Sequence, residues 1–380
     1  MLSFAPINIR IMKRILIAGG YGNAGRCIAQ YLLKAAPQVQ VILAGRQEDK
    51  ARAEAETLDR DFPGRVTGCR IDLADPVILD EVFSKIDFVV NAAGAVPHTR
   101  NVAEALLRHR KSALDTQLSS PEKTRVLEEF APRFEAAGIT YITDGGFHPG
   151  VPAAMLRYAA TRVDSLEKGN IYSALKIDWG KLQFSSDTAP ELIDEFRSNR
   201  LALYQNGVWK DQSAWKVFSF DFGPPFGKQY CAPMYLPEME DLTRQMPSLS
   251  ETGFLVTGFN PITDYLILPI LMLGIQILPR SWDPFLAKLL VWGFKFSRPP
   301  FGIEMVAECA GRKDGKAVQI RVKLAHEDGY VMTAIPVVAC LLQFLDGSIA
   351  GPGLVRQALA VEPIRFMKDL EKMGILVTSH

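Results

Sequence analysis

A glycine-rich turn between a buried strand and a helix constrains this chain more than any other feature of its sequence. The apolar run at residues 14–19 leads into Gly20, Gly22 and Gly25, spaced as G-x-G-x-x-G, and an apolar-periodic helix follows directly. Here the first glycine permits a tight turn, the second leaves room for a pyrophosphate, and the third lets the helix pack closely on the strand. The helix N-terminus offers N–H groups to phosphates. The motif therefore predicts a dinucleotide-binding βαβ unit; the alternative is a tight turn without a ligand.

The first 150 residues alternate between strand and helix patterns. Strand patterns occur at 14–19, 40–44, 66–71, 88–90 and 139–143, and helical patterns include 102–112 and 121–137. The short segment 113–115 fits an edge strand. Strands alternating with helices of this length predict an α/β fold with a doubly wound parallel sheet of the Rossmann type.

The pattern changes after about residue 165, where short strands and turns dominate. Apolar and polar residues alternate over 318–324, and the preceding Asp314-Gly315 is favoured where both turn residues need positive φ. This arrangement predicts an antiparallel hairpin with one solvated face, in a second domain of the α+β class. Pro363 and Gly374 bracket an apolar-periodic segment and predict a capped C-terminal helix.

Charge and cysteine usage exclude several classes of protein. The formal net charge is +1, so no global field attracts nucleic acid. The five cysteines are odd in number and include no C-x-x-C pair, which argues against a disulfide framework or a zinc site. Basic residues interrupt the apolar N-terminus, so no secretory signal is expected. We expect a cytoplasmic protein without a metal, in which residues 1–11 form a short unstructured extension.

Polar residues at predicted strand ends extend the nucleotide site. NAD-specific domains place an acid at the end of the second strand to bond the ribose 2′-hydroxyl, but this strand ends in Gly45-Arg46. A guanidinium suits a 2′-phosphate, so Arg46 favours NADP, with NAD as the alternative cofactor. Asp72 follows the third strand, where it can accept from the adenine amino group or cap a helix. Asn91–Gly94 ends the fourth strand, near the expected pyrophosphate and nicotinamide.

The candidate cofactor-binding residues are therefore Gly20, Tyr21, Gly22, Asn23, Ala24, Gly25, Arg46, Asp72, Asn91, Ala92, Ala93 and Gly94.

Several of these motifs together resemble the saccharopine dehydrogenase-like reductases. The segments that carry the resemblance are Ile15–Gly25, Ala44-Gly-Arg46, Val90–Gly94, Gly145–Pro152, Asp328–Thr333, Leu345-Asp-Gly347 and Met373-Gly-Ile375. The resemblance is good at both ends of the chain and poor in the middle. It implies a homodimer and C-terminal helices that fold back toward the cofactor domain. The expected organisation is a Rossmann domain at 1–150, a substrate and dimerisation domain at 151–330, and returning helices at 331–380.

His148 and Asp144 are the candidate catalytic residues. His148 lies in the Pro-Gly segment, which the family resemblance puts where the sixth strand meets the substrate cleft. There it can donate a proton as hydride is delivered, or it can serve as a loop histidine that caps backbone groups. Asp144 can orient His148, bind a cationic substrate or cap a helix. Many family sequences have Asp at the position of His148, which puts the amino-acid substrate of the namesake enzyme in doubt.

An apolar segment at 262–298 allows two interpretations. Residues 265–279 carry no charge, yet they are fewer than the roughly 20 needed to span a bilayer. Phe285, Leu289, Trp292 and Phe296 then form one helical stripe, with lysines on a neighbouring face. The segment can lie in a membrane interface, or be buried at a dimer interface or over the substrate cleft. We expect the buried arrangement.

Together, these features predict NADP(H)-dependent hydride transfer to or from an imine, secondary amine or carbonyl carbon of a small molecule. A reductase of an apolar, lipid-like substrate at a membrane surface is one alternative. A nucleotide-sensing binding protein without turnover is another.

Overall fold

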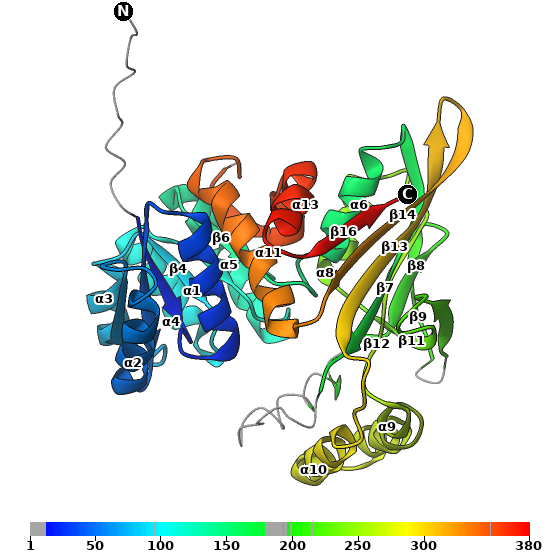
Figure 1. The fold of residues 1–380 in the computed structure, drawn as a ribbon, viewed down its shortest axis with the longest axis horizontal. Helices are drawn as coiled ribbons and strands as arrows, with labels where there is room; N and C mark the ends of the chain where they lie inside the picture. Colours follow the sequence, from blue (N-terminus) through cyan, green and yellow to red (C-terminus); the bar gives the residue numbers. More distant parts are fainter. Residues whose placement is uncertain are drawn as a thin grey trace, which may run out of the picture. The chain divides into compact units, whose positions relative to one another are not determined.

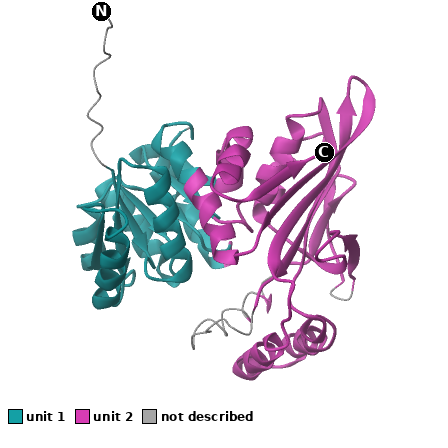
Figure 2. Cartoon of the chain, in the orientation of Figure 1, with its two compact units in different colours: residues 1–118, 122–145, 340–356 teal, residues 119–121, 146–339, 357–380 magenta. Residues whose placement is uncertain are grey.

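The chain forms two compact units in the computed structural model (Figure 2). Unit 1 comprises residues 1–118, 122–145 and 340–356, and unit 2 comprises 119–121, 146–339 and 357–380. The structure describes residues 13–94, 96–178, 193, 196–197, 200–213, 216–349 and 351–380, so the extension expected at 1–11 lies outside the described residues. The first division falls after residue 145 rather than 150, and the segment expected to return to the Rossmann domain is shared between both units.

Unit 1 is built on a parallel sheet (Figure 1). Its strands are β1 (Lys13–Ala18), β2 (Val39–Gly45), β3 (Val66–Arg70), β4 (Phe88–Asn91), β5 (Ser112–Asp115), β6 (Thr140–Thr143) and β15 (Gly353–Arg356). Their order is β15-β6-β5-β4-β1-β2-β3, and every neighbouring pair is parallel. The chain winds outward from β1 in one direction and then in the other, which confirms the doubly wound Rossmann prediction.

Two strands of this sheet differ from expectation. The segment expected at an edge, 113–115, belongs to β5, which lies between β4 and β6. Its shortness suggested an edge, but Ala113, Leu114 and Asp115 are all buried. The strand beyond β6 is β15, which follows β6 by more than two hundred residues in the chain. A short strand with few apolar residues gives little periodic signal, so β15 was missed.

The helices of unit 1 are α1 (Asn23–Ala35), α2 (Glu48–Asp59), α3 (Pro76–Phe83), the short 3-10 turn η1 (Val96–His98), α4 (Thr99–His109), α5 (Pro121–Ala137) and the end of α11 (Gly329–Leu345). Side chains of α3, α4 and α5 form one core with Leu16 and Ala18 of β1. Ile15 and Ile17, which point to the opposite face, are also fully buried. Both faces of the sheet are therefore covered, as a parallel sheet requires.

Unit 2 contains a mixed sheet of nine strands. Its strands are β7 (Ser165–Lys176), β8 (Ala202–Gln205), β9 (Val208–Asp211), β10 (Phe218–Asp221), β11 (Lys228–Met234), β12 (Glu251–Thr257), β13 (Gly302–Lys313), β14 (Lys316–His326) and β16 (Leu376–Ser379). The principal order is β10-β11-β12-β7-β13-β14-β16, in which only β12 and β7 are parallel. Its helices include α6 (Pro152–Ala160), α8 (Pro237–Gln245), α12 (Gln357–Ala360) and α13 (Pro363–Lys372). The predicted α+β second domain is thus confirmed.

The predicted hairpin and C-terminal helix are both present in unit 2. β13 and β14 pair along their length, and the turn residues Asp314 and Gly315 have φ of 50° and 73°. Helix α13 begins at Pro363, and the Glu362 carboxylate caps it by accepting from the N–H groups of Ile364 and Arg365. Gly374 follows with φ of 114°, so the chain turns there as expected.

The apolar segment folds into a helical pair within unit 2. A π-helical turn, η3 (Thr263–Ile267), leads into α9 (Leu268–Ile277), and the turn η4 (Arg280–Trp282) leads into α10 (Asp283–Phe294). Leu271 of α9 packs with Leu286 and Leu290 of α10 in a small core. In the parts of the chain that the structure describes, no helix has both the length and the apolarity needed to cross a bilayer.

Candidate active site

The glycine turn after β1 depends on close backbone contacts. Gly19 adopts φ of 79°, so the left-handed residue of the turn is Gly19 and not Gly20, to which we assigned the turn. A Cβ atom at Gly20 would lie 2.9 Å from the Cα atom of Leu43 in β2. A Cβ atom at Gly25 would lie 2.3 Å from the carbonyl oxygen of Gly19. Gly20 and Gly25 therefore let the turn and the helix pack closely, and larger residues would force them apart.

Gly22 differs from these two because the space beside it is open. A Cβ atom there would meet only the carbonyl oxygen of Gly19, at 3.1 Å. Gly22 and Asn23 are exposed, and Ala24 is half-buried. No side chain caps the start of α1, and its first turn holds no acidic residue. The N-terminus of this helix thus presents backbone N–H groups and a positive partial charge to a group outside the protein.

The residues after β4 lie next to the glycine turn. Asn91 pairs with Ala18 at the end of β1, and a Cβ atom at Gly19 would lie 2.8 Å from the carbonyl oxygen of Ala92. The buried Asn91 side chain accepts from the N–H of Ala93, and the carbonyl oxygen of Ala93 accepts from Gln117. The structure therefore brings Asn91–Gly94 and the glycine turn together where the winding of the sheet reverses. Open α/β sheets bind their ligands at this switch point.

Tyr21 contacts the residues on either side of Arg46 at the end of β2. The Tyr21 hydroxyl accepts from the N–H of Gln47 at 3.3 Å. The Tyr21 ring covers Gly45, where a Cβ atom would come within 2.4 Å of the ring. Arg46 lies between Gly45 and Gln47 in the chain, and it is exposed. Gly45 thus makes room for the Tyr21 ring next to Arg46. The G-x-G-x-x-G motif did not predict this role for Gly45.

Asp72 follows β3, the strand next to β2. Its carboxylate accepts from the N–H of Ala74 at 3.0 Å, which stabilises the turn before α3. The N-cap of α3 is Asp75, whose side chain accepts from Val77 and Ile78. Asp72 therefore does not cap the helix. It is half-buried and lies in a turn at the carboxyl edge of the sheet.

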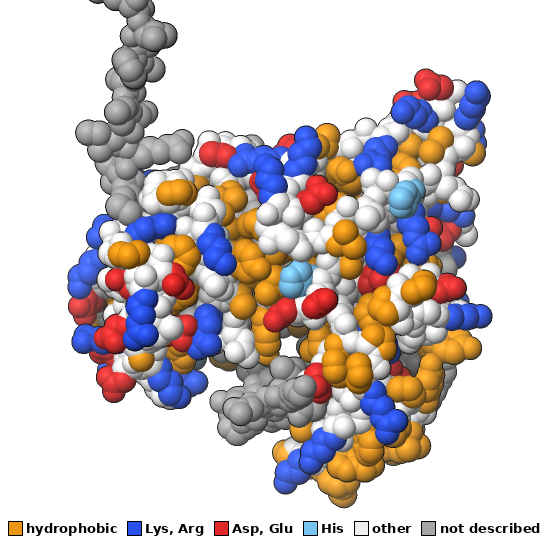
Figure 3. All heavy atoms as spheres, in the orientation of Figure 1, with side chains coloured by type: hydrophobic (Ala, Val, Ile, Leu, Met, Phe, Trp, Pro, Cys, Tyr) orange, Lys and Arg blue, Asp and Glu red, His pale blue; other side chains and the backbone are white. Residues whose placement is uncertain are grey.

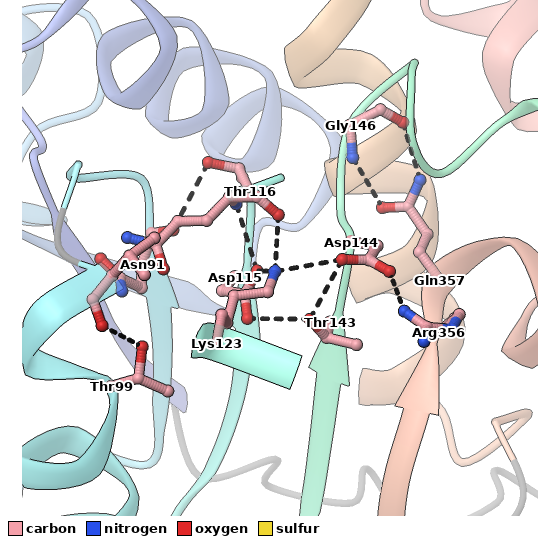
Figure 4. A network of polar contacts seen from close by, with 12 residues as sticks. Asn91, Thr99, Asp115, Thr116, Lys123, Thr143, Asp144, Gly146, Arg356 and Gln357 are labelled. Atoms are coloured by element: carbon pink, nitrogen blue, oxygen red, sulfur yellow. Dashed lines mark hydrogen bonds and ion pairs between the residues drawn. The ribbon is translucent and has the colours of Figure 1, made fainter. Parts of the chain in front are cut away.

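A buried network of charged side chains joins the ends of β5, β6 and β15 (Figure 4). The Lys123 ammonium donates to Asp115 at 2.8 Å, to Asp144 at 3.0 Å and to the carbonyl oxygen of Gln117 at 2.6 Å. Arg356, from β15, forms an ion pair with the second oxygen of Asp144. Thr143 donates to Asp115 at 3.1 Å. Two carboxylates and two cations thus balance one another inside unit 1.

The charges in this network stabilise one another. Burial by itself lowers the pKa of Lys123, but Asp115 and Asp144 outweigh it, and the pKa is raised overall. Burial and the adjacent Asp115 raise the pKa of Tyr141 well above its usual range, so the phenol stays neutral. Asp144, with φ of 60°, is engaged by Lys123 and Arg356. In this structure it is a buried ion-pair residue, and neither a helix cap nor an unpaired carboxylate.

Sequence reasoning missed every member of this network except Asp144. Asp115 ends a buried strand, which is a recognisable signal for a site at the carboxyl edge of a sheet. Lys123 lies in the first turn of α5, where the helix dipole favours acidic residues, so its position was an unused signal. Arg356 belongs to the strand that was not predicted.

Two buried side chains of unit 2 hold the loop at residues 146–152. Gln357 donates to the carbonyl oxygens of Gly146 at 2.9 Å and Gly150 at 3.1 Å. Glu238 accepts from the N–H groups of Gly150 at 2.6 Å and Ala153 at 3.1 Å, and so caps α6. Both side chains are fully buried. The backbone of the loop that carries His148 is therefore held by hydrogen bonds to two side chains, Gln357 and Glu238.

His148 lies on this fixed loop between aromatic rings. Its ring is 3.8 Å from that of Phe147 and 5.7 Å from that of Phe254, centroid to centroid. Part of the residue is accessible, but both ring nitrogens are buried and have no hydrogen-bond partner among the described residues. Burial lowers the pKa of His148 to about 4, so the imidazole is neutral at neutral pH. The expectation that it caps backbone groups is therefore wrong, and its nitrogens are not engaged by the described residues.

The described residues contain no group of three or more His, Cys, Asp or Glu side chains arranged to hold a metal ion.

We predict that Lys123→Met destabilises the protein by about 3–5 kcal/mol, because two buried carboxylates would lose their shared cation. Unfolding in urea, followed by circular dichroism, measures the change. Lys50→Met is the matched control, since Lys50 is an exposed lysine of α2 in the same unit. Equal stability of the two variants would contradict the role given to the network.

Comparisons with known proteins agree with this geometry. Residues 15–142 match the family model of the saccharopine dehydrogenase NADP-binding domain. Carboxynorspermidine synthase of Vibrio cholerae is 27% identical over 342 residues, covering 78% of each chain. Carboxyaminopropylagmatine dehydrogenase of Synechocystis is 22% identical over 253 residues, covering 65% of this chain and 62% of the relative.

A solved structure has a similar fold over most of the chain. Saccharopine dehydrogenase (L-Glu forming) from Saccharomyces cerevisiae superposes with a TM-score of 0.69 at 16% identity, covering 97% of this chain and 99% of that one. The match to the NADP-binding domain agrees with the exposed Arg46 at the end of β2. Residues 15–142 are therefore an NADP-binding Rossmann domain of the saccharopine dehydrogenase type, and the chain is an NAD(P)-dependent oxidoreductase.

Proposed function

We propose that this protein transfers hydride between NADP(H) and the carbon of an imine or secondary amine in a small, polar substrate. In the reducing direction, hydride adds to the carbon of a protonated imine, the C=N electron pair moves to nitrogen, and a secondary amine forms. Bound NADPH would supply that hydride. Reduction of a carbonyl carbon is the related reaction, and it also needs a proton at the oxygen.

The observation that carries this proposal is the open N-terminus of α1 beside Gly22 at the switch point of the sheet. A pyrophosphate there would accept from backbone N–H groups of Asn23, Ala24 and Gly25. Arg46 would pair with the 2′-phosphate, and the adjacent Tyr21 ring limits where the adenosine can lie. Asp72 and Asn91–Gly94 would line the same edge of the sheet.

The names of the relatives support an amine as the substrate class. Carboxynorspermidine synthase and carboxyaminopropylagmatine dehydrogenase are both named after carboxyl-bearing amines. A substrate of this kind carries anionic and cationic groups that require hydrogen-bonding partners in the site. Both relatives are named as enzymes, a synthase and a dehydrogenase, which supports catalysis over a sensing role without turnover.

We propose His148 as a substrate ligand or proton donor. Its depressed pKa favours the neutral ring, which has one N–H donor and one acceptor nitrogen. An N–H donor suits a substrate carboxylate, and an acceptor nitrogen suits an ammonium group. Chain connectivity supports this assignment, because His148 is the fifth residue after Thr143, where β6 ends, and five steps along the chain span at most about 18 Å.

The exposed apolar side chains of α9 and α10 favour one alternative, an apolar substrate presented at a membrane. A polar amine and an apolar substrate differ in where they partition, so kinetics can distinguish them.

We expect Gly22→Val to weaken NADP binding at least about a hundredfold while the fold survives. The new side chain would fill the approach of the pyrophosphate, yet its Cβ atom meets only one protein atom. Fluorescence titration with NADPH measures affinity, and circular dichroism verifies the fold. Ala53→Val introduces the same valine side chain at an exposed position of α2 and should leave binding unchanged. Normal binding by a folded Gly22→Val protein would exclude this site.

Arg46→Ala should reduce the preference for NADP over NAD about tenfold or more, since a charge-assisted pair with the 2′-phosphate would be lost. The dissociation constants of both cofactors for wild type and variant test this. Arg60→Ala, which removes another exposed arginine of unit 1, is the control. Equal affinity of the wild type for NADP and NAD would reject the assignment.

The proposed reaction is tested by NADPH oxidation with pairs of a polar amine and a carbonyl compound, with ketones alone, and with apolar carbonyl compounds. We expect turnover with amine–carbonyl pairs. His148→Gln should lower that turnover about tenfold or more and leave NADP affinity nearly unchanged, because the residue lies on the unit 2 loop. His380→Gln removes an exposed histidine and should behave as wild type.

Other results would decide against parts of this proposal. NADPH binding without oxidation by any pair would indicate a binding protein. Oxidation confined to apolar compounds would indicate the membrane-surface reductase. Unaltered kinetics of His148→Gln would return His148 to a structural role.

A further inference from the structure

The helical pair α9–α10 exposes an unusual share of the large apolar side chains (Figure 3). Nine of the fifteen that are exposed in the described residues lie between 262 and 292. They are Ile262, Tyr265, Leu266, Ile270, Leu273, Ile277, Trp282, Phe285 and Trp292. Single exposed apolar residues are ordinary, but a contiguous group of this size indicates an interaction surface.

The exposed side chains follow helical spacing. Leu266, Ile270, Leu273 and Ile277 recur every three or four residues, so they form one stripe along η3 and α9. In α10, Phe285 and Trp292 are seven residues apart and share one face. Both faces are apolar without being buried in the described chain.

The pair does not need this surface for its own folding. Leu271, Leu286, Leu290 and Phe294 already form its core, together with Ile193. The helices approach closely: a Cβ atom at Gly274 would lie 3.0 Å from Leu286, and one at Gly293 would lie 2.4 Å from Ile267. Arg197 also bonds Asp283 at 2.6 Å. The outward apolar side chains are therefore not needed to fill the core of the pair.

The charges of this segment have one sign where they are exposed. Arg280, Lys288, Lys295 and Arg298 are exposed, whereas its two acids, Asp264 and Asp283, are at least half-buried. At 100° per residue, Lys288 and Lys295 lie on the flank of the Phe285–Trp292 stripe. Lysines in such positions can extend their ammonium groups past the apolar stems toward lipid phosphates.

From these observations we propose that the α9–α10 surface binds an anionic lipid bilayer, with its apolar stripes in the interface and its basic side chains at the headgroups. A second copy of the chain is the competing occupant. A twofold contact would oppose the surface to itself, bringing basic side chains together with no exposed acid in the segment to neutralise them. Charge complementarity therefore favours the bilayer. This inference does not depend on the proposed reaction.

Co-sedimentation with phosphatidylcholine vesicles, with and without phosphatidylglycerol, tests the proposal. We expect binding to the anionic vesicles that weakens as salt is added, because ions screen the lysines. The double variant Ile270→Glu/Trp292→Glu should bind the anionic vesicles at least about tenfold more weakly than wild type. Val77→Glu, which replaces an apolar side chain 76% exposed on α3, should bind as wild type.

A second pair of variants isolates the charge contribution. Lys288→Gln/Lys295→Gln should weaken binding to anionic vesicles about thirtyfold and leave any binding to phosphatidylcholine unchanged. Lys313→Gln/Lys316→Gln, at the β13–β14 turn, is the control with the same loss of charge.

Two further measurements on each variant complete the test: its oligomeric state in solution and its affinity for NADPH. Wild type that stays in solution with anionic vesicles would overturn the proposal, as would equal losses in the control variants. An Ile270→Glu/Trp292→Glu protein that dissociates from an oligomer, with no vesicle binding by wild type, would assign the surface to a second copy. Failed turnover with intact vesicle binding would reject only the proposed reaction.

Discussion

The buried ion-pair network around Lys123 ties together parts of unit 1 that are far apart in the chain. Lys123 bonds residues at the ends of β5 and β6, and Asp144 carries the network on to Arg356 in β15. Removing any one of these charges would leave an opposite charge buried without compensation, which is costly at low polarity. The network therefore couples β15 to the rest of the Rossmann sheet, and it shapes the edge at which the chain leaves unit 1 after β6.

The glycine turn, at the same edge of the sheet, combines close backbone packing with an open position for a ligand. Gly19, Gly20 and Gly25 let backbone approach backbone, and only Gly22 faces open space. The close packing holds the start of α1 rigid, and the open position leaves its N–H groups accessible. Rigid donors that need no rearrangement on binding suit a phosphate site, because less ordering is required when the ligand arrives. The requirements of packing and of binding are thus divided among neighbouring glycines.

Unit 2 combines a fixed loop with a helical pair that has a small core. Gln357 and Glu238 hold the backbone around His148 through buried hydrogen bonds, so the orientation of that ring does not depend on a mobile loop. The α9–α10 pair instead packs in a small separate core with Ile193, and it joins the sheet between the end of β12 and the start of β13. A helical pair placed in this way can carry a surface for lipid without altering the residues that hold the His148 loop.

Local patterns in the sequence determined the doubly wound sheet, the glycine turn, the β13–β14 hairpin and the capped α13, because each depends on residues close together in the chain. Arg46 was recognised as a candidate in the same way, from its place at a strand end. The tertiary structure decided what long-range contacts control. It placed β15 beside β6, made β5 an internal strand, engaged Asp144 with Lys123 and Arg356, and left the His148 nitrogens without described partners. It also exposed a surface of α9–α10 that periodicity alone could equally assign to a core. Burial and ion pairing join residues up to 212 positions apart, and no local pattern contains that information.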